Sequence, residues 1–210
     1  MRNILLSLII LISSNLFGQN NDIINSQKEN YTKAEQLLKN SNGLEALFYY
    51  HQVCFPNLKT DFEDKAKQRI DSLLPIYQKM ESSKWKGKWE LKQLKTNLFA
   101  FEKIIITENI ISFYNKVTDT IASRNEKIKH TEYDPNDFVV NINSLKFENN
   151  EIWEFSTEKT DNELRLFPNL KTESNGTTWL LLDERAMIRN DVEREKALAE
   201  EIRTYYVKIK

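Results

Sequence analysis

The stretch Trp85-Lys86-Gly87-Lys88-Trp89-Glu90-Leu91 marks the point where the spacing of apolar residues changes. Upstream of it, between residues 20 and 82, apolar residues recur three or four positions apart, which is typical of amphipathic helices. Downstream of it, short runs alternate apolar and polar residues between polar turns, which is typical of strands that bury one face. The sequence therefore predicts an α+β protein, with a helical segment followed by an antiparallel sheet.

Two breaks divide the upstream part into three predicted helices, one break at residues 40–43 and the other at residues 56–60. Asp61 follows the second break, with two further acidic residues just after it. Carboxylates suit the start of a helix because they cap its free N–H groups and complement its dipole. Pro75 lies inside the third helix, which is therefore expected either to kink or to split there.

Part of the helical segment reads Ala34-x-x-Leu37-Leu38-x-x-Ser41-x-Gly43-Leu44-Glu45-Ala46-x-x-x-Tyr50 and resembles a tetratricopeptide unit. In that family a small residue on each helix allows close packing and an aromatic residue fills the groove, which are roles that Ala34, Ala46 and Tyr50 match. The chain departs from the family because an early aromatic residue is missing, Pro56 comes two residues early and no second complete repeat follows. A generic helical hairpin stays open as the alternative.

The remaining part of the chain, residues 83–210, is expected to hold eight or nine short strands. Two of the runs flank Glu108-Asn109 as in a hairpin, and Glu148-Asn149-Asn150 is a good turn between two others. A charged helix is expected at residues 191–201. So many short strands indicate an antiparallel barrel or sandwich. The expected strands are residues 89–94, 102–107, 110–114, 121–128, 138–147, 152–156, 163–167, 178–189 and 203–209.

The triplet Gly87-x-Trp89 opens the first of these strands. A glycine and a tryptophan so placed at the start of an up-and-down barrel resemble the lipocalin and calycin signature. The resemblance implies that Trp89 plugs the closed end of the barrel and that a basic residue from the last strand covers it. Arg203 and Lys208 are the two basic residues considered for that role. Another small β-barrel or a sandwich stays open as the alternative.

If Trp89 points inward, the two-residue period of a strand assigns further side chains to the interior. Interior positions would include Leu91, Gln93, Ile111, Val207 and Ile209. An eight-stranded barrel has room for its own side chains or for one small ligand. Two interpretations therefore stay open, a packed core filled by aromatic rings and a cavity for a small apolar ligand. The proposed ligand-binding residues are Trp89, Phe113, Trp153, Phe155 and Tyr205.

The first residues read as a signal peptide, with Arg2 as their only charge and an apolar run at residues 4–12. Such a run rises only about 13 Å as a helix, against about 30 Å for the hydrocarbon core of a bilayer. Cleavage is expected after Gly18, and the leader resembles those of exported proteins from Bacteroidota-type bacteria. The predicted divisions are a signal peptide at 1–18, a helical segment at 19–82 and a barrel at 83–210, in the periplasm or outside the cell.

Composition narrows the range of partners. The chain has 210 residues, of which 30 are basic and 31 acidic, so no positive patch for nucleic acid is expected. Apolar residues make up 40% of the chain, which supplies enough material for a buried core. Cys54 is the single cysteine, so no intramolecular disulfide can form.

Catalytic and cofactor motifs are missing from the sequence. It contains two histidines and no His-Glu-x-x-His, Gly-x-Ser-x-Gly, phosphate-binding glycine loop or paired Cys-x-x-Cys. His51 and Cys54 lie three residues apart on one predicted helix, where they could be a base beside a thiol, two metal ligands or part of a packed face. Their neighbours are apolar, which favours the packed face. We expect no catalytic residues, no metal and no cofactor, and therefore no enzyme.

Two functions follow as hypotheses. In the first, an exported, non-catalytic protein with a lipocalin-like barrel binds a small apolar ligand. In the second, the helical segment is a protein-protein interaction module of the cell envelope, and the barrel is a packed structural domain. The second places a peptide or an envelope protein in a groove near Tyr49, Tyr50 and Tyr77.

Overall fold

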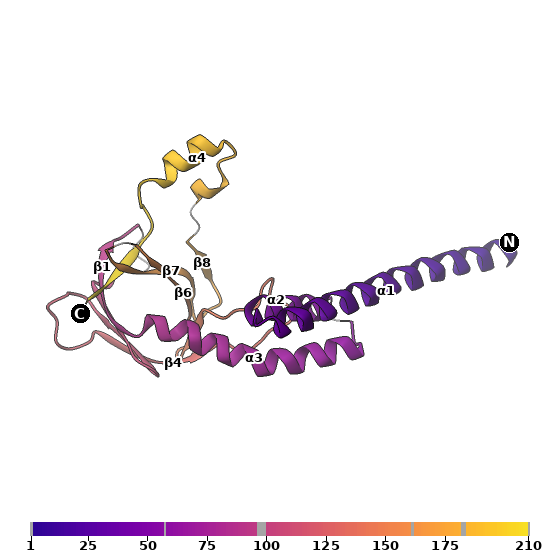
Figure 1. Ribbon diagram of the computed structural model, residues 1–210, viewed down its shortest axis with the longest axis horizontal. Coiled ribbons are helices and arrows are strands. Elements are labelled where there is room, and N and C mark those ends of the chain that lie inside the picture. Colours follow the sequence, from indigo (N-terminus) through magenta and orange to yellow (C-terminus); the bar gives the residue numbers. More distant parts are fainter. Residues whose placement is uncertain (1, 57, 96–99, 161, 182–183, 210) are drawn as a thin grey trace. The chain divides into compact units, whose positions relative to one another are not determined.

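The computed structural model describes residues 2–56, 58–95, 100–160, 162–181 and 184–209, and for residues 2–20 and 184 only the course of the backbone (Figure 1). Two compact units make up the fold. The first, the helical unit, comprises Met1–Tyr77 and Glu132–Asn141, and the second, the barrel unit, comprises Gln78–Thr131 and Ile142–Lys210. The predicted leader, residues 1–18, falls in the part of the first helix for which side chains are not described, and it stays a prediction.

Three helices occupy the N-terminal part of the chain: α1 (Arg2–Lys39), α2 (Gly43–Cys54) and α3 (Asp61–Trp85). The tight turn between α1 and α2 is made possible by Ser41, which adopts a positive φ of 62°. Ala34 on α1 and Ala46 on α2 are both fully buried, as is Tyr50. Small side chains at these positions let the two helix backbones approach closely, and α2 packs along α1 for that reason.

Pro75 does not split the third helix. α3 runs without a break from Asp61 to Trp85, so the alternative of two separate helices is wrong. A proline removes one hydrogen bond from a helix interior, at a cost of about 3 kcal/mol. Burial of Ile70 and Leu74 before it and Gln78 after it offsets that cost. Packing therefore overrides the local preference of the proline.

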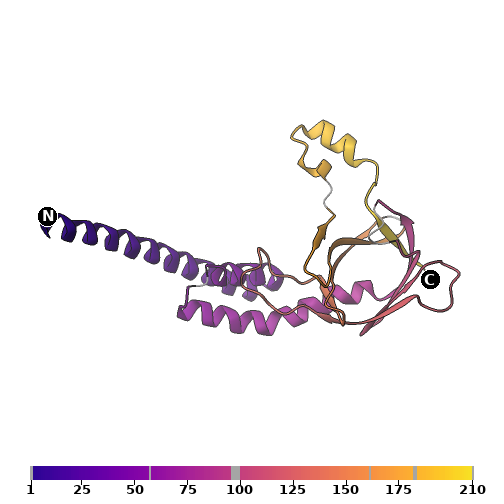
Figure 2. The same ribbon diagram turned by 180° about the vertical axis from the view of Figure 1, so that it is seen from behind.

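The barrel unit is a closed antiparallel barrel of eight strands (Figure 2). Strands β1 to β7 follow one another as an up-and-down meander, and pairing of β6 with β7, β7 with β9 and β9 with β1 closes the ring. This confirms the predicted fold class. The strands are β1 (Gly87–Gln93), β2 (Lys103–Ile106), β3 (Ile110–Tyr114), β4 (Arg124–His130), β5 (Ser144–Phe147), β6 (Ile152–Lys159), β7 (Leu164–Thr172), β8 (Thr178–Leu180) and β9 (Tyr205–Ile209).

β8 lies outside the closed ring. It pairs with β7 at Leu170–Thr172, while β9 pairs with the same edge of β7 at Arg165 and Leu166. Of the strand expected at residues 178–189, only Thr178–Leu180 forms β8. The expectation is wrong at Glu184–Met187, which forms a short 3₁₀ helix, η2, while residues 182–183 lie outside the described residues. The expected charged helix is present as α4 (Asp191–Leu198), which starts at the side-chain cap of Asn190.

The strand expected at residues 138–147 is shorter than predicted. Only Ser144–Phe147 forms β5, and Glu132–Asn141 packs with the helical unit instead. Tyr133 explains this assignment because its hydroxyl lies 3.1 Å from Nδ1 of His51 on α2. A tertiary contact of the loop thus replaces the strand that local alternation suggested.

Candidate functional site

The barrel interior is the candidate site. Two tryptophans close the end of the barrel at which β1 begins. Trp85, the last residue of α3, and Trp89 on β1 are both fully buried. The Nε1–H of Trp89 donates to the carbonyl oxygen of Trp85 at 2.6 Å. Gly87 lies between them with a φ of +133°, a conformation that L side chains rarely adopt. The glycine thus turns the chain from helix into strand and directs both indole rings inward.

The last strand supplies a cation at the same end. Lys208 pairs in register with Trp89, and its Nζ lies 5.3 Å from the centre of an aromatic ring of that tryptophan. A cation above an indole face is attracted by the negative face of the ring. Of the two basic residues considered from the sequence, Lys208 therefore covers Trp89. The guanidinium of Arg203 lies over the ring of Phe167 instead.

Four of the five proposed ligand-binding residues lie in one core cluster, namely Trp89, Phe113, Trp153 and Phe155. Each has a relative exposure of 0%. The ring centres of Phe113 and Trp153 lie 5.1 Å apart, and those of Trp153 and Phe155 lie 6.0 Å apart. A side chain that bordered a void wide enough for water would retain accessible surface, and these four retain none. Their arrangement is that of a packed core.

Tyr205, the fifth proposed residue, was expected inside the barrel, and that expectation is wrong. Tyr206 is fully buried in the core, whereas Tyr205 is half-buried on the other face of β9. The ring centre of Tyr205 lies 5.7 Å from that of Phe167, and the guanidinium of Arg165 lies 4.6 Å above the Tyr205 ring. Phe167 and Arg165 thus bury part of the outer face of β9, which explains why its side chains there are apolar.

A charged cluster closes the opposite end of the interior. Arg124 on β4 donates to Glu126 at 2.8 Å and to Glu151 at 2.9 Å. Its guanidinium lies 5.4 Å from the ring centre of Phe113 and 5.5 Å from that of Phe147. The Nε1–H of Trp153 also donates to Glu151. We call Arg124, Glu126 and Glu151 the polar cap, because they cover the aromatic core where β4 and β6 begin.

The polar cap favours the ionised forms of Arg124 and Glu151. Burial alone would raise the pKa of Glu151, but hydrogen bonds and charge attraction from Arg124 outweigh burial and lower it. The Arg124 side chain pairs with both carboxylates of the cap, so the cation is already neutralised. The sequence did not reveal this cluster, because Arg-Asn-Glu-Lys-Ile-Lys-His on β4 shows no apolar alternation. The pairing of Arg124 with Phe113 could have been found only from the register.

His51 and Cys54 both belong to the packed face of α2. Both side chains are fully buried, and the sulfur of Cys54 lies 4.0 Å from the carbonyl oxygen of Glu63. Burial raises the pKa of the Cys54 thiol to about 11, so the thiolate is scarce at neutral pH. Among the residues that the structure describes, no group of three or more His, Cys, Asp or Glu side chains is placed to hold a metal ion.

The helical unit carries an exposed apolar surface, but not where the sequence suggested. Tyr50 is fully buried and donates to Glu35 at 2.7 Å, so it cannot line an open groove. Leu44, Phe48 and Phe55 are instead 42–47% exposed. We call these three residues the α2 stripe. Helical spacing could have indicated it, since the three residues fall on one side of the predicted helix.

Comparison with protein-family models, with curated proteins and with solved structures finds no match to this chain. In the described part of the chain, no helix carries an apolar stretch long enough to cross a bilayer.

Proposed function

We propose that this protein is an exported, non-catalytic interaction module, in which the helical unit binds another protein of the cell envelope and the barrel is a packed structural domain. The observation that carries the proposal is the α2 stripe, an apolar surface left uncovered on a helix whose other face is fully packed. The filled interior of the barrel supports the second half of the proposal.

The three residues of the stripe lie on one side of α2, with the buried His51 between Phe48 and Phe55. At about 100° per residue, Leu44, Phe48 and Phe55 point within about 40° of one another around the helix axis. On the opposite side of α2, Ala46, Tyr50 and Val53 are completely buried. Single exposed apolar residues are ordinary on a soluble protein, but a contiguous group of large ones marks a binding surface. An apolar face of a partner helix or peptide fits such a stripe.

Export and the family resemblances belong to the same proposal. The predicted leader places the protein in the periplasm or outside the cell. The position of Lys208 above Trp89 supports a lipocalin-like barrel, and burial of Ala34 and Ala46 supports a tetratricopeptide-like helical pair. Binding of a small apolar ligand in the barrel is the weaker alternative, because the residues proposed to line the lumen pack against one another.

Substitution of the stripe tests the proposal. The full chain with Phe48→Ser or Leu44→Ser is used as bait for envelope proteins, beside the unchanged chain. Ile121→Ser is the matched control, since Ile121 is a large exposed apolar residue of the barrel unit. We expect a partner that the unchanged chain and I121S capture equally and that F48S and L44S lose. Equal capture by all four proteins, or no specific capture, would refute the function proposed for the stripe.

A further inference from the structure

Between β8 and β9, the described residues form a projection from the barrel that includes η2 and α4. Its two ends are fixed to the barrel wall, because the N–H of Leu181 donates to Asn169 at 2.8 Å and the hydroxyl of Thr204 accepts from the N–H of Lys95 at 2.8 Å. Arg203 adds a bidentate ion pair to Glu158 on β6, at 2.8 and 2.9 Å. We call η2 and α4 together the arm.

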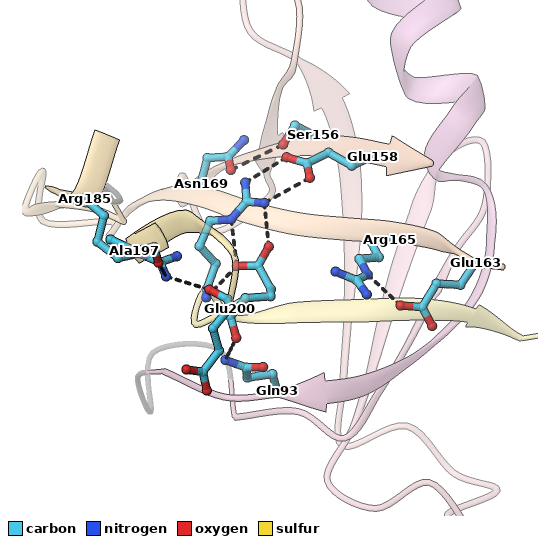
Figure 3. Close-up of polar contacts among 11 residues, drawn as sticks. Gln93, Ser156, Glu158, Glu163, Arg165, Asn169, Arg185, Ala197 and Glu200 are labelled. Atoms are coloured by element: carbon cyan, nitrogen blue, oxygen red, sulfur yellow. Dashed lines mark hydrogen bonds and ion pairs between the residues drawn. The ribbon is translucent and has the colours of Figure 1, made fainter. Parts of the chain in front are cut away.

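The arm is held together by its own polar contacts (Figure 3). The guanidinium of Arg185 on η2 donates to the carbonyl oxygens of Ala197 and Glu200, both at 2.6 Å. At the base of the arm, Gln93 on β1 donates to the carbonyl oxygen of Glu201 at 2.8 Å. Yet no residue of α4 is buried. An eight-residue helix is marginal in water without packing, so a covered state of the arm is expected.

The strand beside the arm has an open edge. β7 and β8 form a hairpin. Its backbone hydrogen bonds from Leu181 to Asn169 and from Glu173 to Thr177 show which residue pairs are hydrogen-bonded between the two strands. In an antiparallel pair these residues alternate, so the N–H and C=O groups of Thr178 and Leu180 point away from β7. Within the described residues, β8 pairs with β7 alone. The edge thus offers two donors and two acceptors to another extended strand.

At three residues β8 is short, which itself limits an open edge, but the edge has none of the chemical protection that proteins use. Proteins guard open edges with charged residues, proline or bulges. β8 reads Thr178-Trp179-Leu180 and carries no charge, while Trp179 is 44% exposed and Leu180 is 54% exposed. The groups left open are backbone groups, so the partner that fits them is an extended polypeptide rather than a small molecule.

We propose that the occupant is β8 of a second copy of this chain, paired antiparallel about a two-fold axis through Trp179. In that arrangement Thr178 of each copy lies opposite Leu180 of the other, and all four open groups of each edge are satisfied at once. An antiparallel edge is complementary to itself, and this one brings no like charges together. Each arm also carries exposed apolar residues, Met187, Val192 and Leu198.

A proline substitution tests the hydrogen bonds of this interface. Because the N–H of Leu180 points away from β7, Leu180→Pro removes a donor to the second copy without removing a bond within the barrel. Leu180→Ala is the matched control, since it shortens the same side chain and keeps the N–H. By sedimentation velocity of the full chain, we expect a dimer for the unchanged protein and L180A, and a monomer for L180P. The two variants should have the same melting temperature, which would show that both remain folded.

A disulfide test locates the axis. Two copies of Trp179 would form a non-hydrogen-bonded pair with Cα atoms about 4.5 Å apart, which is within the range of a disulfide. Trp179→Cys should therefore give a covalent dimer on mild oxidation, whereas Lys127→Cys, an exposed position on β4, should not. Cys54 is buried and does not compete.

Each other result overturns the proposal. A monomer at every concentration, a dimer that L180P leaves intact, or equal cross-linking of W179C and K127C would each contradict pairing through β8. A monomer that binds an extended peptide of another protein at this edge would also contradict it. Substitutions in the α2 stripe, which belongs to the other unit, should leave this assembly unchanged, so the two proposals fail separately.

Discussion

Glu35 joins three helices through one carboxylate. It accepts hydrogen bonds from Tyr50 on α2 at 2.7 Å and from Arg69 on α3 at 2.9 and 3.1 Å. Burial would raise its pKa, but these donors outweigh burial and lower it. Because the folded state holds the proton less tightly than the unfolded state, this group contributes stability above the pKa of an unfolded Glu, about 4.3. The contribution is lost as pH falls through the lower, folded pKa.

Glu35→Gln should therefore lower the free energy of unfolding at pH 7 by about 1.5–3 kcal/mol, the range for hydrogen bonds to charged groups. The variant should also lose part of the acid sensitivity of the unchanged protein below about pH 4.5. Urea unfolding at several pH values measures both effects. Glu29→Gln, on the exposed side of α1, is the control and should match the unchanged protein. Equal stability of E35Q and E29Q would contradict the role given to Glu35.

The ring of Tyr77 leaves no room for a side chain at position 43, which is a glycine. A methyl group added at Gly43 would overlap the hydroxyl of Tyr77, which packs against the start of α2. Gly43→Ala should therefore destabilise by about 1–3 kcal/mol, as overpacking does, although alanine is normally the better helix former. Adding Tyr77→Phe removes the overlapping hydroxyl and should restore part of the loss. Thermal unfolding of the two single variants and the double variant gives the coupling, and strict additivity would exclude the contact as the cause.

His130 is part of the contact between the end of α3 and the barrel wall. Its Nε2 lies 3.3 Å from the hydroxyl of Ser82, and Gln78 donates to the carbonyl oxygen of Thr131 next to it. Burial lowers the pKa of His130, partly opposed by the backbone of Ser144 and by the charge of Glu108. The folded state thus binds this proton less tightly than an unfolded histidine, whose pKa is about 6.5. The stability from this group is complete above that value and falls as pH drops below it.

Between about pH 7 and pH 5, the unchanged protein should lose stability, and His130→Gln should show a smaller loss over the same range. Denaturant unfolding of both proteins at each pH measures the difference. The carboxylates discussed above titrate lower and do not account for it. Parallel pH profiles for the two proteins would contradict the role given to His130 in holding α3.

The elements differ in how far the sequence could predict them. Alternation on β1, β3 and β6 correctly placed Trp89, Phe113 and Trp153 inside, because each strand has an apolar face toward the core and a polar face toward water. It failed on β9. There Tyr205 lies on the outer face beneath Arg165, while Lys208 shares the inner face with Tyr206 because it covers an indole ring. A cation used as a cover for the core cannot be recognised from alternation alone.

The same limit applies to the candidate surfaces. The number of strands indicated a barrel or a sandwich, and the resemblance at Gly87 and Trp89 favoured the barrel, but nothing in the sequence indicated the departure of β8 from the ring. Residues 178–189 read as one strand, and only the return of β9 to the edge of β7 shows why it ends at Leu180. The polar cap and the arm likewise depend on contacts between residues far apart in the chain, such as Arg124 with Glu151. Local sequence patterns carry no information on such pairs.

At the scale of the whole molecule, the barrel depends on its aromatic core for stability. Trp153 lies at the centre of that core, with ring contacts to Phe113, Phe147 and Phe155. Trp153→Ala should destabilise the protein by about 3–5 kcal/mol and leave a cavity that surrounding side chains fill only in part. Because an apolar cavity of this kind binds small apolar molecules, indole should raise the melting temperature of W153A and not that of the unchanged protein. An equal rise in both would reveal a cavity already present.

If the interior of this barrel is a packed core and the protein acts through its surfaces, no small molecule should stay bound to it. Native mass spectrometry of the full chain, purified without detergent from its own host, measures this. We expect the mass of the polypeptide alone or of its dimer, with nothing released into organic solvent. A lipid or pigment that stays bound in the spectrum at a fixed ratio to the chain, and that solvent extraction removes, would contradict it.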